Sequence, residues 1–203
     1  MKITAIKQRR KGLSELFIDG EPSVKLDTQV VLRSGLGEGS LLDDEQLHTL
    51  IRDSEKYRAN EKALYLLEFR NHTQKELQEK IKRSGISQEA AREAVEKMEE
   101  IGLLDDAAYA KNLARTLFER KKYGFRRVQQ ELRLKGISPE IAEQVLVEFA
   151  PEDAAEVIRE LLERKYSSYA QDEKVKRRAV AAMLRFGYQN DDIRRAMREE
   201  PGD

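Results

Sequence analysis

The residues of this chain that could do chemistry are clustered lysines and arginines, and the chemistry that they suit is phosphate binding. Residues 120–135 include seven basic residues and one acidic residue, and residues 174–185 include five basic residues and no acidic residue. Basic clusters of this density attract nucleic acids, because phosphate contacts release condensed counterions. The alternative is that these charged helix faces are simply solvated. The candidate contacts are Lys121, Lys122, Arg126, Arg127, Arg133, Lys135, Lys176, Arg177, Arg178 and Arg185, together with Lys75 from an earlier segment.

The stretch Tyr123–Ser138 must position the first of these clusters. Apolar residues recur at helical spacing on one side of it, and they are Phe125, Val128 and Leu132. Gly136 is the kind of residue that ends a helix, and Ser138 followed by Pro139 is typical of an N-cap and the first position of the next helix. The sequence therefore predicts a helix, a tight turn and a second helix, with an apolar face in the core and a cationic face outside.

The same unit recurs 51 residues away in both directions, which predicts three tandem repeats. The glycines that end the second helix of each repeat are Gly85, Gly136 and Gly187. The apolar positions move with the glycines, so that Leu77 corresponds to Val128 and Ile81 corresponds to Leu132. Equivalent basic positions one turn into each second helix are Lys75, Arg126 and Arg177. A cationic row along one edge of the repeat array is the expected result.

Four segments are expected, and the fold class is mainly α. Residues 1–56 should form a small β-hairpin or meander and a helix, and residues 57–104, 105–150 and 151–203 should form three helix-turn-helix-like repeats of three helices each. Short helices are marginal alone, so packing within and between repeats must hold them. An elongated, curved and somewhat flexible array is expected.

The first segment has short β-prone runs separated by turn residues, unlike the helical apolar spacing of the repeats. Its β-prone runs are residues 3–8, 13–18 and 24–26, and Asp19-Gly20 is a strong hairpin signal between two of them. A helix capped near Asp43 or Asp44 is expected to end at about Lys56.

Caps and apolar stripes place the helices of the repeats. The expected N-caps are Thr73, Ser87 and Asp105. Ile101 is assigned to the apolar stripe of its helix, Leu103 and Leu104 are expected to fill the join between the first two repeats, and Tyr109 should face the second core. In the third repeat, helices are expected from residue 151 to about 169, from 177 to 186 and from 191 to 199.

Acidic bands separate the basic clusters. Residues 87–106 include seven acidic and two basic residues, and residues 140–163 include eight acidic residues and one basic residue. Alternating bands suit a partner that offers both phosphate and protein surface.

Several function classes find no support in the sequence. The chain has no cysteine and only two histidines, His48 and His72, which do not have the spacing of metal ligands or of a catalytic base. The glycine-rich residues 34–40 lack the third glycine of a dinucleotide fingerprint, and no Gly-Lys-Ser/Thr follows. No enzyme activity, cofactor or metal is expected. The missing cysteines, membrane segment and signal peptide favour a cytoplasmic protein with no membrane partner.

The residues of the second repeat resemble the RecX regulatory proteins of bacteria. The most specific matches are Tyr123-Gly124 with Glu131-Leu132 and Lys135-Gly136-Ile137, and Leu104-Asp105-Asp106 with Tyr109-Ala110. This resemblance covers essentially the whole chain and implies three tandem three-helix repeats. It also implies binding to the RecA recombinase and to its filament on single-stranded DNA, with restraint of strand exchange, ATP hydrolysis and co-protease action. Weaker binding to duplex DNA and a monomeric state are further expectations.

Two other functions remain open at the level of sequence. The first is a helix-turn-helix protein that reads DNA directly, although such readers usually work as dimers with one recognition helix. The second is a helical-repeat adaptor that binds only proteins, although the two basic clusters then lack an anionic partner.

Overall fold

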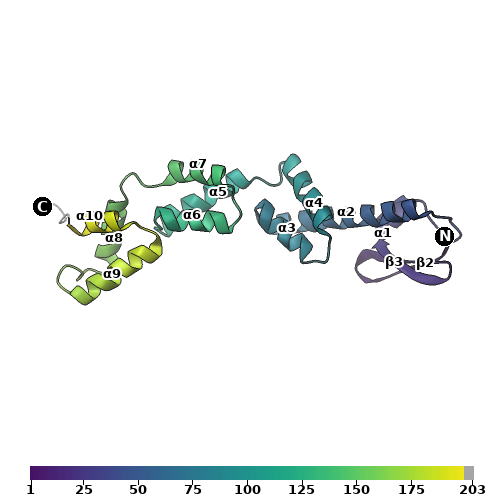
Figure 1. Ribbon diagram of the computed structural model, residues 1–203, viewed down its shortest axis with the longest axis horizontal. Helices are drawn as coiled ribbons and strands as arrows, with labels where there is room; N and C mark the ends of the chain where they lie inside the picture. Colours follow the sequence, from purple (N-terminus) through teal and green to yellow (C-terminus); the bar gives the residue numbers. More distant parts are fainter. Residues whose placement is uncertain (199–203) are drawn as a thin grey trace. The chain divides into compact units, whose positions relative to one another are not determined.

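A computed structural model describes residues 1–198 of the chain, which divide into two compact units, Met1–Leu104 and a second unit that begins at Asp105. A small sheet opens the first unit, and the rest of the described chain is helical (Figure 1). The mainly α fold class is confirmed. The predicted end of the last helix at residue 199 lies outside the described residues.

The amino-terminal sheet is an antiparallel meander of three strands, as predicted. The strands are β1 (Ile3–Gln8), β2 (Leu13–Ile18) and β3 (Glu21–Asp27), in the order β1-β2-β3. Asp19 and Gly20 both have positive φ, at 51° and 93°, as the two central residues of a tight hairpin turn require. The third strand begins earlier than the expected residue 24. It accommodates a proline because it is an edge strand with a register shift at this point.

Helix α2 differs most from the sequence prediction. After the short α1 (Thr28–Arg33), which was not predicted, α2 runs without a break over Asp44–Phe69. The expected helix end near Lys56 is therefore wrong, and the predicted segment boundary between residues 56 and 57 falls inside this helix. No glycine or proline interrupts the sequence there, and Ala59 continues the buried face. The Asp43 side chain caps the helix and accepts a hydrogen bond of 2.7 Å from the Gln46 N–H.

Because α2 is continuous, it contributes to two hydrophobic cores. Leu50 packs with the sheet residues Ile3 and Leu16, and the Ser54 hydroxyl accepts a 2.7 Å hydrogen bond from the Asp27 N–H. Further along, Ala59 and other residues of α2 pack with the first repeat. The sheet and the first repeat are therefore joined through one helix.

The first repeat is completed by α3 (Gln74–Lys82) and α4 (Gln88–Glu100), which Thr73 and Ser87 cap as predicted. Leu77 is fully buried. Ile101 is 54% exposed and Leu103 is 51% exposed, so neither belongs to the core, and only Leu104 is buried at this point. The helix ends at Glu100, which releases Ile101 from the helical stripe.

The second repeat consists of α5 (Asp106–Arg115), continued by the π-helical turn η2 (Thr116–Arg120), then α6 (Phe125–Leu134) and α7 (Pro139–Phe149). Asp105 caps α5 and Ser138 caps α7, as predicted. Val128 and Leu132 are fully buried, and Tyr109 packs partly buried against the same core. Phe125, which was expected in that core, is instead 41% exposed.

The third repeat consists of α8 (Ala154–Lys165), α9 (Glu173–Phe186) and α10 (Asn190–Arg198). Helix α8 ends before the expected residue 169, because the backbone leaves the helical conformation at Tyr166. Helix α9 begins before the expected residue 177, because Asp172 caps it by accepting from the N–H groups of Lys174 and Val175.

The glycines that define the repeat share one backbone conformation. Gly85, Gly136 and Gly187 have φ of 84°, 83° and 91°, in the left-handed region that favours glycine. The prediction that each ends its helix is confirmed.

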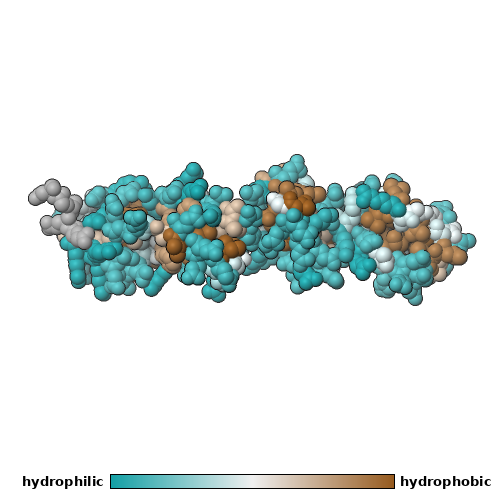
Figure 2. Space-filling view, turned by 90° about the horizontal axis from the view of Figure 1, so that it is seen from above, coloured by the Kyte–Doolittle hydropathy of each residue, from teal (hydrophilic) through white to brown (hydrophobic). Residues whose placement is uncertain are grey.

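Each repeat has its own hydrophobic core, and the sheet with α1 and the start of α2 has another. On the face shown in Figure 2, hydrophobic residues form patches on a largely hydrophilic surface. Of the helices in residues 1–198, none combines the length and apolar character that crossing a bilayer requires.

Leu132 tests the assignment of the second core. Replacement of this fully buried side chain, Leu132→Ala, should reduce the free energy of unfolding by about 2–5 kcal/mol, because it removes apolar contacts and leaves a cavity. The measurement is urea unfolding followed by circular dichroism. Gln129→Ala, on the exposed side of the same helix, is the control and should change stability by less than about 0.5 kcal/mol. Equal losses in the two variants would contradict the assignment.

His72 makes the stability of the first unit depend on pH. The ring is buried, and burial together with the charges of Arg70 and Lys80 lowers the pKa of His72, although Glu76 opposes this shift. As the pH falls below about 6.5, the unfolded chain gains a proton on His72 that the folded chain does not accept, so stability should decrease. The measurement is chemical unfolding at several pH values between 7.5 and 5.5.

The same pH series on two glutamine variants isolates the buried ring. His72→Gln should lose this pH dependence, whereas His48→Gln, which changes an exposed histidine of α2, should keep it. Identical pH profiles for His72→Gln and the unmodified protein would show that another group is responsible.

Candidate nucleic-acid interface

The cationic face predicted for the second repeat lies on α6. Arg126 and Arg133 are exposed, and within residues 1–198 neither has an ion-pair partner. Lys135 is half-buried at the end of the helix. Arg127 differs from these residues, because its guanidinium lies 2.7 Å from a carboxylate oxygen of Glu131. Arg126 and Arg133 are thus the side chains of α6 best placed to meet a phosphate.

The segment before α6 uses its two lysines differently. Lys121 is exposed, with its ammonium 5.7 Å from the centre of the Tyr123 ring. Lys122 has a positive φ of 53°, and its ammonium lies 3.1 Å from a carboxylate oxygen of Glu160 on α8. Because this ion pair links the second and third repeats, Lys122 has a structural contact as well as a predicted binding role.

The start of α6 meets the end of α9 through backbone hydrogen bonds. The Gly124 N–H donates to the Phe186 carbonyl at 2.8 Å, and the Arg126 N–H donates to the Gly187 carbonyl at 3.3 Å. The first N–H groups of a helix and the last carbonyls of a helix have no partners within their own helix. Here the unpaired groups of α6 and of α9 satisfy each other, and the helix dipoles meet with opposite partial charges.

Side chains close around this junction. The rings of Tyr123 and Phe186 pack edge to face with their centres 5.6 Å apart. The Tyr188 hydroxyl donates a 2.9 Å hydrogen bond to the Lys122 carbonyl. Burial raises the pKa of Tyr188, with a further contribution from Glu160, so this hydroxyl remains protonated and able to donate.

The junction requires glycine on both sides. A Cβ at Gly124 would lie 2.6 Å from backbone atoms of Gly187 and of Tyr188, and a Cβ at Gly187 would overlap the backbone nitrogen of Arg127. This contact was not predicted from the sequence, whose repeat pattern indicated Gly187 only as a helix end. One available signal was that Gly124 begins a helix without a capping side chain, which suggests that groups outside the helix satisfy its first N–H groups.

The junction brings the two basic clusters into one unit. On α9, four predicted contacts are exposed, and they are Lys176, Arg177, Arg178 and Arg185. Arg177 lies 3.6 Å from Glu173, four residues earlier, in an exposed pair of little energetic weight. Lys75 is exposed on α3 of the other unit. Its membership of a common cationic row remains a prediction.

Some of the acidic residues form ion pairs between helices. Lys56 of α2 pairs with Glu93 of α4 at 2.8 Å, and Lys111 of α5 pairs with Glu148 of α7 at 2.9 Å. The acidic bands therefore help to orient helices within a repeat, in addition to any role toward a partner.

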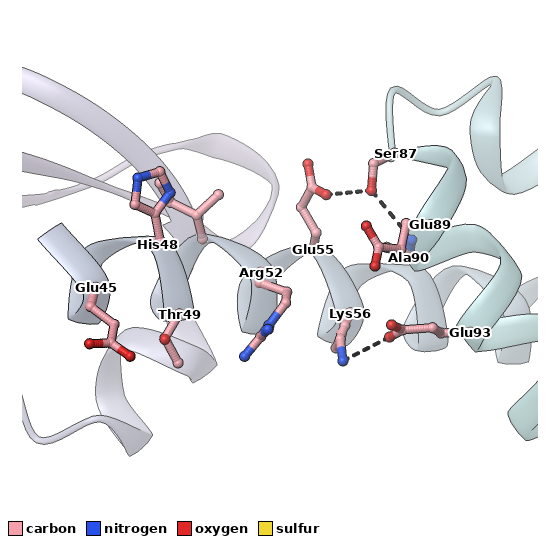
Figure 3. Close-up of a pocket in the computed structure, with 11 residues that line it drawn as sticks. Glu45, His48, Thr49, Arg52, Glu55, Lys56, Ser87, Glu89, Ala90 and Glu93 are labelled. Carbon is pink, nitrogen blue, oxygen red and sulfur yellow. Dashed lines mark hydrogen bonds and ion pairs between the residues drawn. The ribbon is translucent and has the colours of Figure 1, made fainter.

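A charged groove in the first unit lies between α2 and the start of α4 (Figure 3). The Ser87 hydroxyl, which caps α4, donates a 2.5 Å hydrogen bond to Glu55, and the Lys56 pair with Glu93 closes the groove further along. His48 and Arg52 belong to the same lining. Among residues 1–198 no group of three or more His, Asp or Glu could hold a metal ion. The groups that meet across this groove attach α4 to α2.

The order of the three repeats along the chain matches that of a known protein family. Sequence models of RecX match the chain in order, with the first three-helix domain at residues 59–98, the second at 105–146 and the third at 152–197. The regulatory protein RecX of Caldanaerobacter subterraneus subsp. tengcongensis is 33% identical over 199 residues, which cover 97% of this chain and 98% of that protein. The chain belongs to the RecX family of regulatory proteins.

Other RecX proteins agree with this assignment. The regulatory protein RecX of Trichlorobacter lovleyi is 38% identical over 136 residues, which cover 65% of this chain and 88% of that protein. A crystal structure of a regulatory protein RecX superposes with a TM-score of 0.69 at 24% identity, covering 98% of this chain and 99% of that one. RecX from Lactobacillus salivarius gives 0.63 at 23% identity, covering 70% and 94%. The predicted family and the three tandem three-helix repeats are confirmed.

The close approach at the junction can be tested against a matched glycine. Gly187→Ala should reduce stability by clearly more than Gly85→Ala, because both residues have similar positive φ but only Gly187 faces atoms within 3 Å. The conformational term alone should cost about 1–2 kcal/mol in each variant. Thermal unfolding of the two variants gives the comparison. Equal losses would show that the α6 and α9 ends do not meet as described.

Proposed function

We propose that this RecX protein is a non-enzymatic regulator that binds the RecA recombinase and RecA filaments on single-stranded DNA. In this role it lowers strand exchange, ATP hydrolysis and co-protease activity, and so modulates recombination and DNA repair. Family membership supports the regulatory part of the proposal. Binding to single strands, with weaker binding to duplex DNA, action as a monomer and location in the cytoplasm belong to the same proposal.

The observation that carries the proposal is the joining of two basic helices, α6 and α9, at one backbone junction. Six basic side chains of these helices are exposed and have no ion-pair partner among the described residues, and they are Arg126, Arg133, Lys174, Lys176, Arg178 and Arg185. Exposed cations with no internal partner are available for phosphates of a nucleic-acid strand.

The surroundings of the two histidines support a regulator rather than an enzyme. His72 is buried beside Glu76, and burial together with the neighbouring positive charges lowers its pKa. This shift is explained by packing inside the repeat and does not require a substrate site. His48 is exposed on α2. A general base must lie within reach of a substrate proton, which the buried His72 does not provide. In the groove that His48 lines, Ser87 bonds to Glu55 and Lys56 pairs with Glu93, so these polar groups already serve the packing of α4 on α2.

Charge reversal on α6 tests the proposal. Arg126→Glu combined with Arg133→Glu should weaken binding to single-stranded DNA and to RecA filaments, and should reduce the inhibition of RecA ATP hydrolysis. Each phosphate contact contributes about 0.7 to the slope of log affinity against log salt, so the slope should decrease by about 1.4. The measurements are co-sedimentation with RecA filaments, anisotropy titrations with labelled strands at several salt concentrations, and the ATPase assay.

The control makes the same change in net charge on an acidic helix. Arg92→Glu combined with Lys97→Glu changes two exposed residues of α4 and should leave the salt slope for bare DNA unchanged. Wild-type affinity and slope in the folded α6 variant would refute the phosphate role of these arginines. Inhibition of RecA without any DNA binding would instead favour an adaptor that binds only protein, and DNA binding without any effect on RecA would favour a protein that acts directly on DNA.

A further inference from the structure

The groove between α6 and α7 has an exposed aromatic ring at its edge. Phe125 occupies the first position of α6, and its side chain lines this groove although it follows the apolar spacing of the helix. The neighbouring Tyr123 ring packs against Phe186, but Phe125 has no ring partner among the described residues. A large apolar side chain is thus left at the surface, although Val128 and Leu132, which share its apolar spacing, are fully buried.

The polar side chains of the groove surround this ring with a particular chemistry. Arg126, Gln129, Gln130 and Arg133 line it from α6, and Glu143 lines it from α7. Four apolar residues also line it: Ile137, Ala142 and Leu146, which belong to the repeat core, and the exposed Pro139. The groove thus combines an aromatic surface, two cations and two side-chain amides, with one acidic group.

This combination matches an unpaired nucleotide better than a protein segment. An aromatic side chain can stack on the face of any base, and arginines beside it can contact the adjoining phosphates. Glutamine amides can donate to and accept from base edges. A groove that holds an amphipathic protein helix is hydrophobic, whereas five of the ten residues that line this groove are polar or charged, namely Arg126, Gln129, Gln130, Arg133 and Glu143. In duplex DNA the base faces are stacked on one another and cannot reach the ring.

We propose that the α6–α7 groove is a nucleobase-stacking site for single-stranded DNA. Phe125 stacks on one base, and Arg126 and Arg133 contact the phosphates beside it. This inference rests on the single-strand binding proposed above and adds to it a reason for preferring single strands over duplex. It also gives a physical role to the one apolar residue of α6 that was expected in the core and lies outside it.

The experiment separates stacking from phosphate binding. An oligodeoxythymidylate and an abasic strand of equal length and charge are titrated against the full chain by competition with a labelled strand. Wild-type protein should bind the strand with bases about 5- to 100-fold more tightly than the abasic strand, within the range that one stacked base contributes. Phe125→Leu should bind the two strands alike and keep the wild-type affinity for the abasic strand.

A second aromatic variant gives a direct signal. The chain has no tryptophan, so Phe125→Trp introduces a single indole at the site. This variant should keep the preference for bases, and its fluorescence should be quenched by the oligodeoxythymidylate and not by the abasic strand. Leu134→Ala, which alters an exposed apolar residue of α6 outside the groove, should keep the wild-type preference.

Three outcomes would overturn the stacking site. Equal affinity of the wild type for both strands would remove it and leave phosphate binding intact. An unchanged preference in folded Phe125→Leu would move stacking to another residue. Absence of binding to either strand would refute both this site and the single-strand part of the proposed function, whatever the effect on RecA.

Discussion

The arrangement of the second unit depends on two backbone hydrogen bonds between the end of α9 and the start of α6. Helices of this length are unstable alone, so each must obtain its stability from neighbours, and polar groups at helix ends must find partners. At the junction, the Phe186 and Gly187 carbonyls serve as the cap of α6, which has no capping side chain of its own. The second and third repeats are therefore held together by main-chain contacts that any change in side-chain charge leaves in place.

Local sequence signals predicted most of the helix starts, because a cap depends on residues only a few positions apart. Thr73, Ser87 and Ser138 accept hydrogen bonds from N–H groups three residues later, as their sequence context indicated. The continuous α2 was missed because a change of packing partner halfway along a helix leaves no mark on its local propensity. Ile101 and Phe125 were misplaced for a related reason. Helical spacing shows on which side of a helix a residue lies, but it does not show whether neighbouring helices extend far enough to bury that residue.

The candidate site was predictable in part. The basic clusters are evident in the sequence, and the pairing of Arg127 with Glu131 follows from their spacing of four residues on a helix. The pairing of Lys122 with Glu160 could not be predicted, because it joins residues that only the folded junction brings together. Charge composition therefore located the cationic surface but could not separate the residues available to a ligand from those already engaged.

The continuity of α2 limits how the length of this chain can vary. Leu50 packs with the sheet and Ala59 packs with the first repeat, and only helical turns separate them. An α-helix turns by about 100° and rises about 1.5 Å per residue. Inserting or deleting a single residue between these two positions would rotate the sheet about a quarter turn around the helix axis relative to the repeat, whereas a change of about seven residues would nearly restore its orientation. The number of residues between Leu50 and Ala59 thus sets the orientation of the sheet relative to the repeat. Length changes are therefore expected in the loops that flank α2 rather than within it.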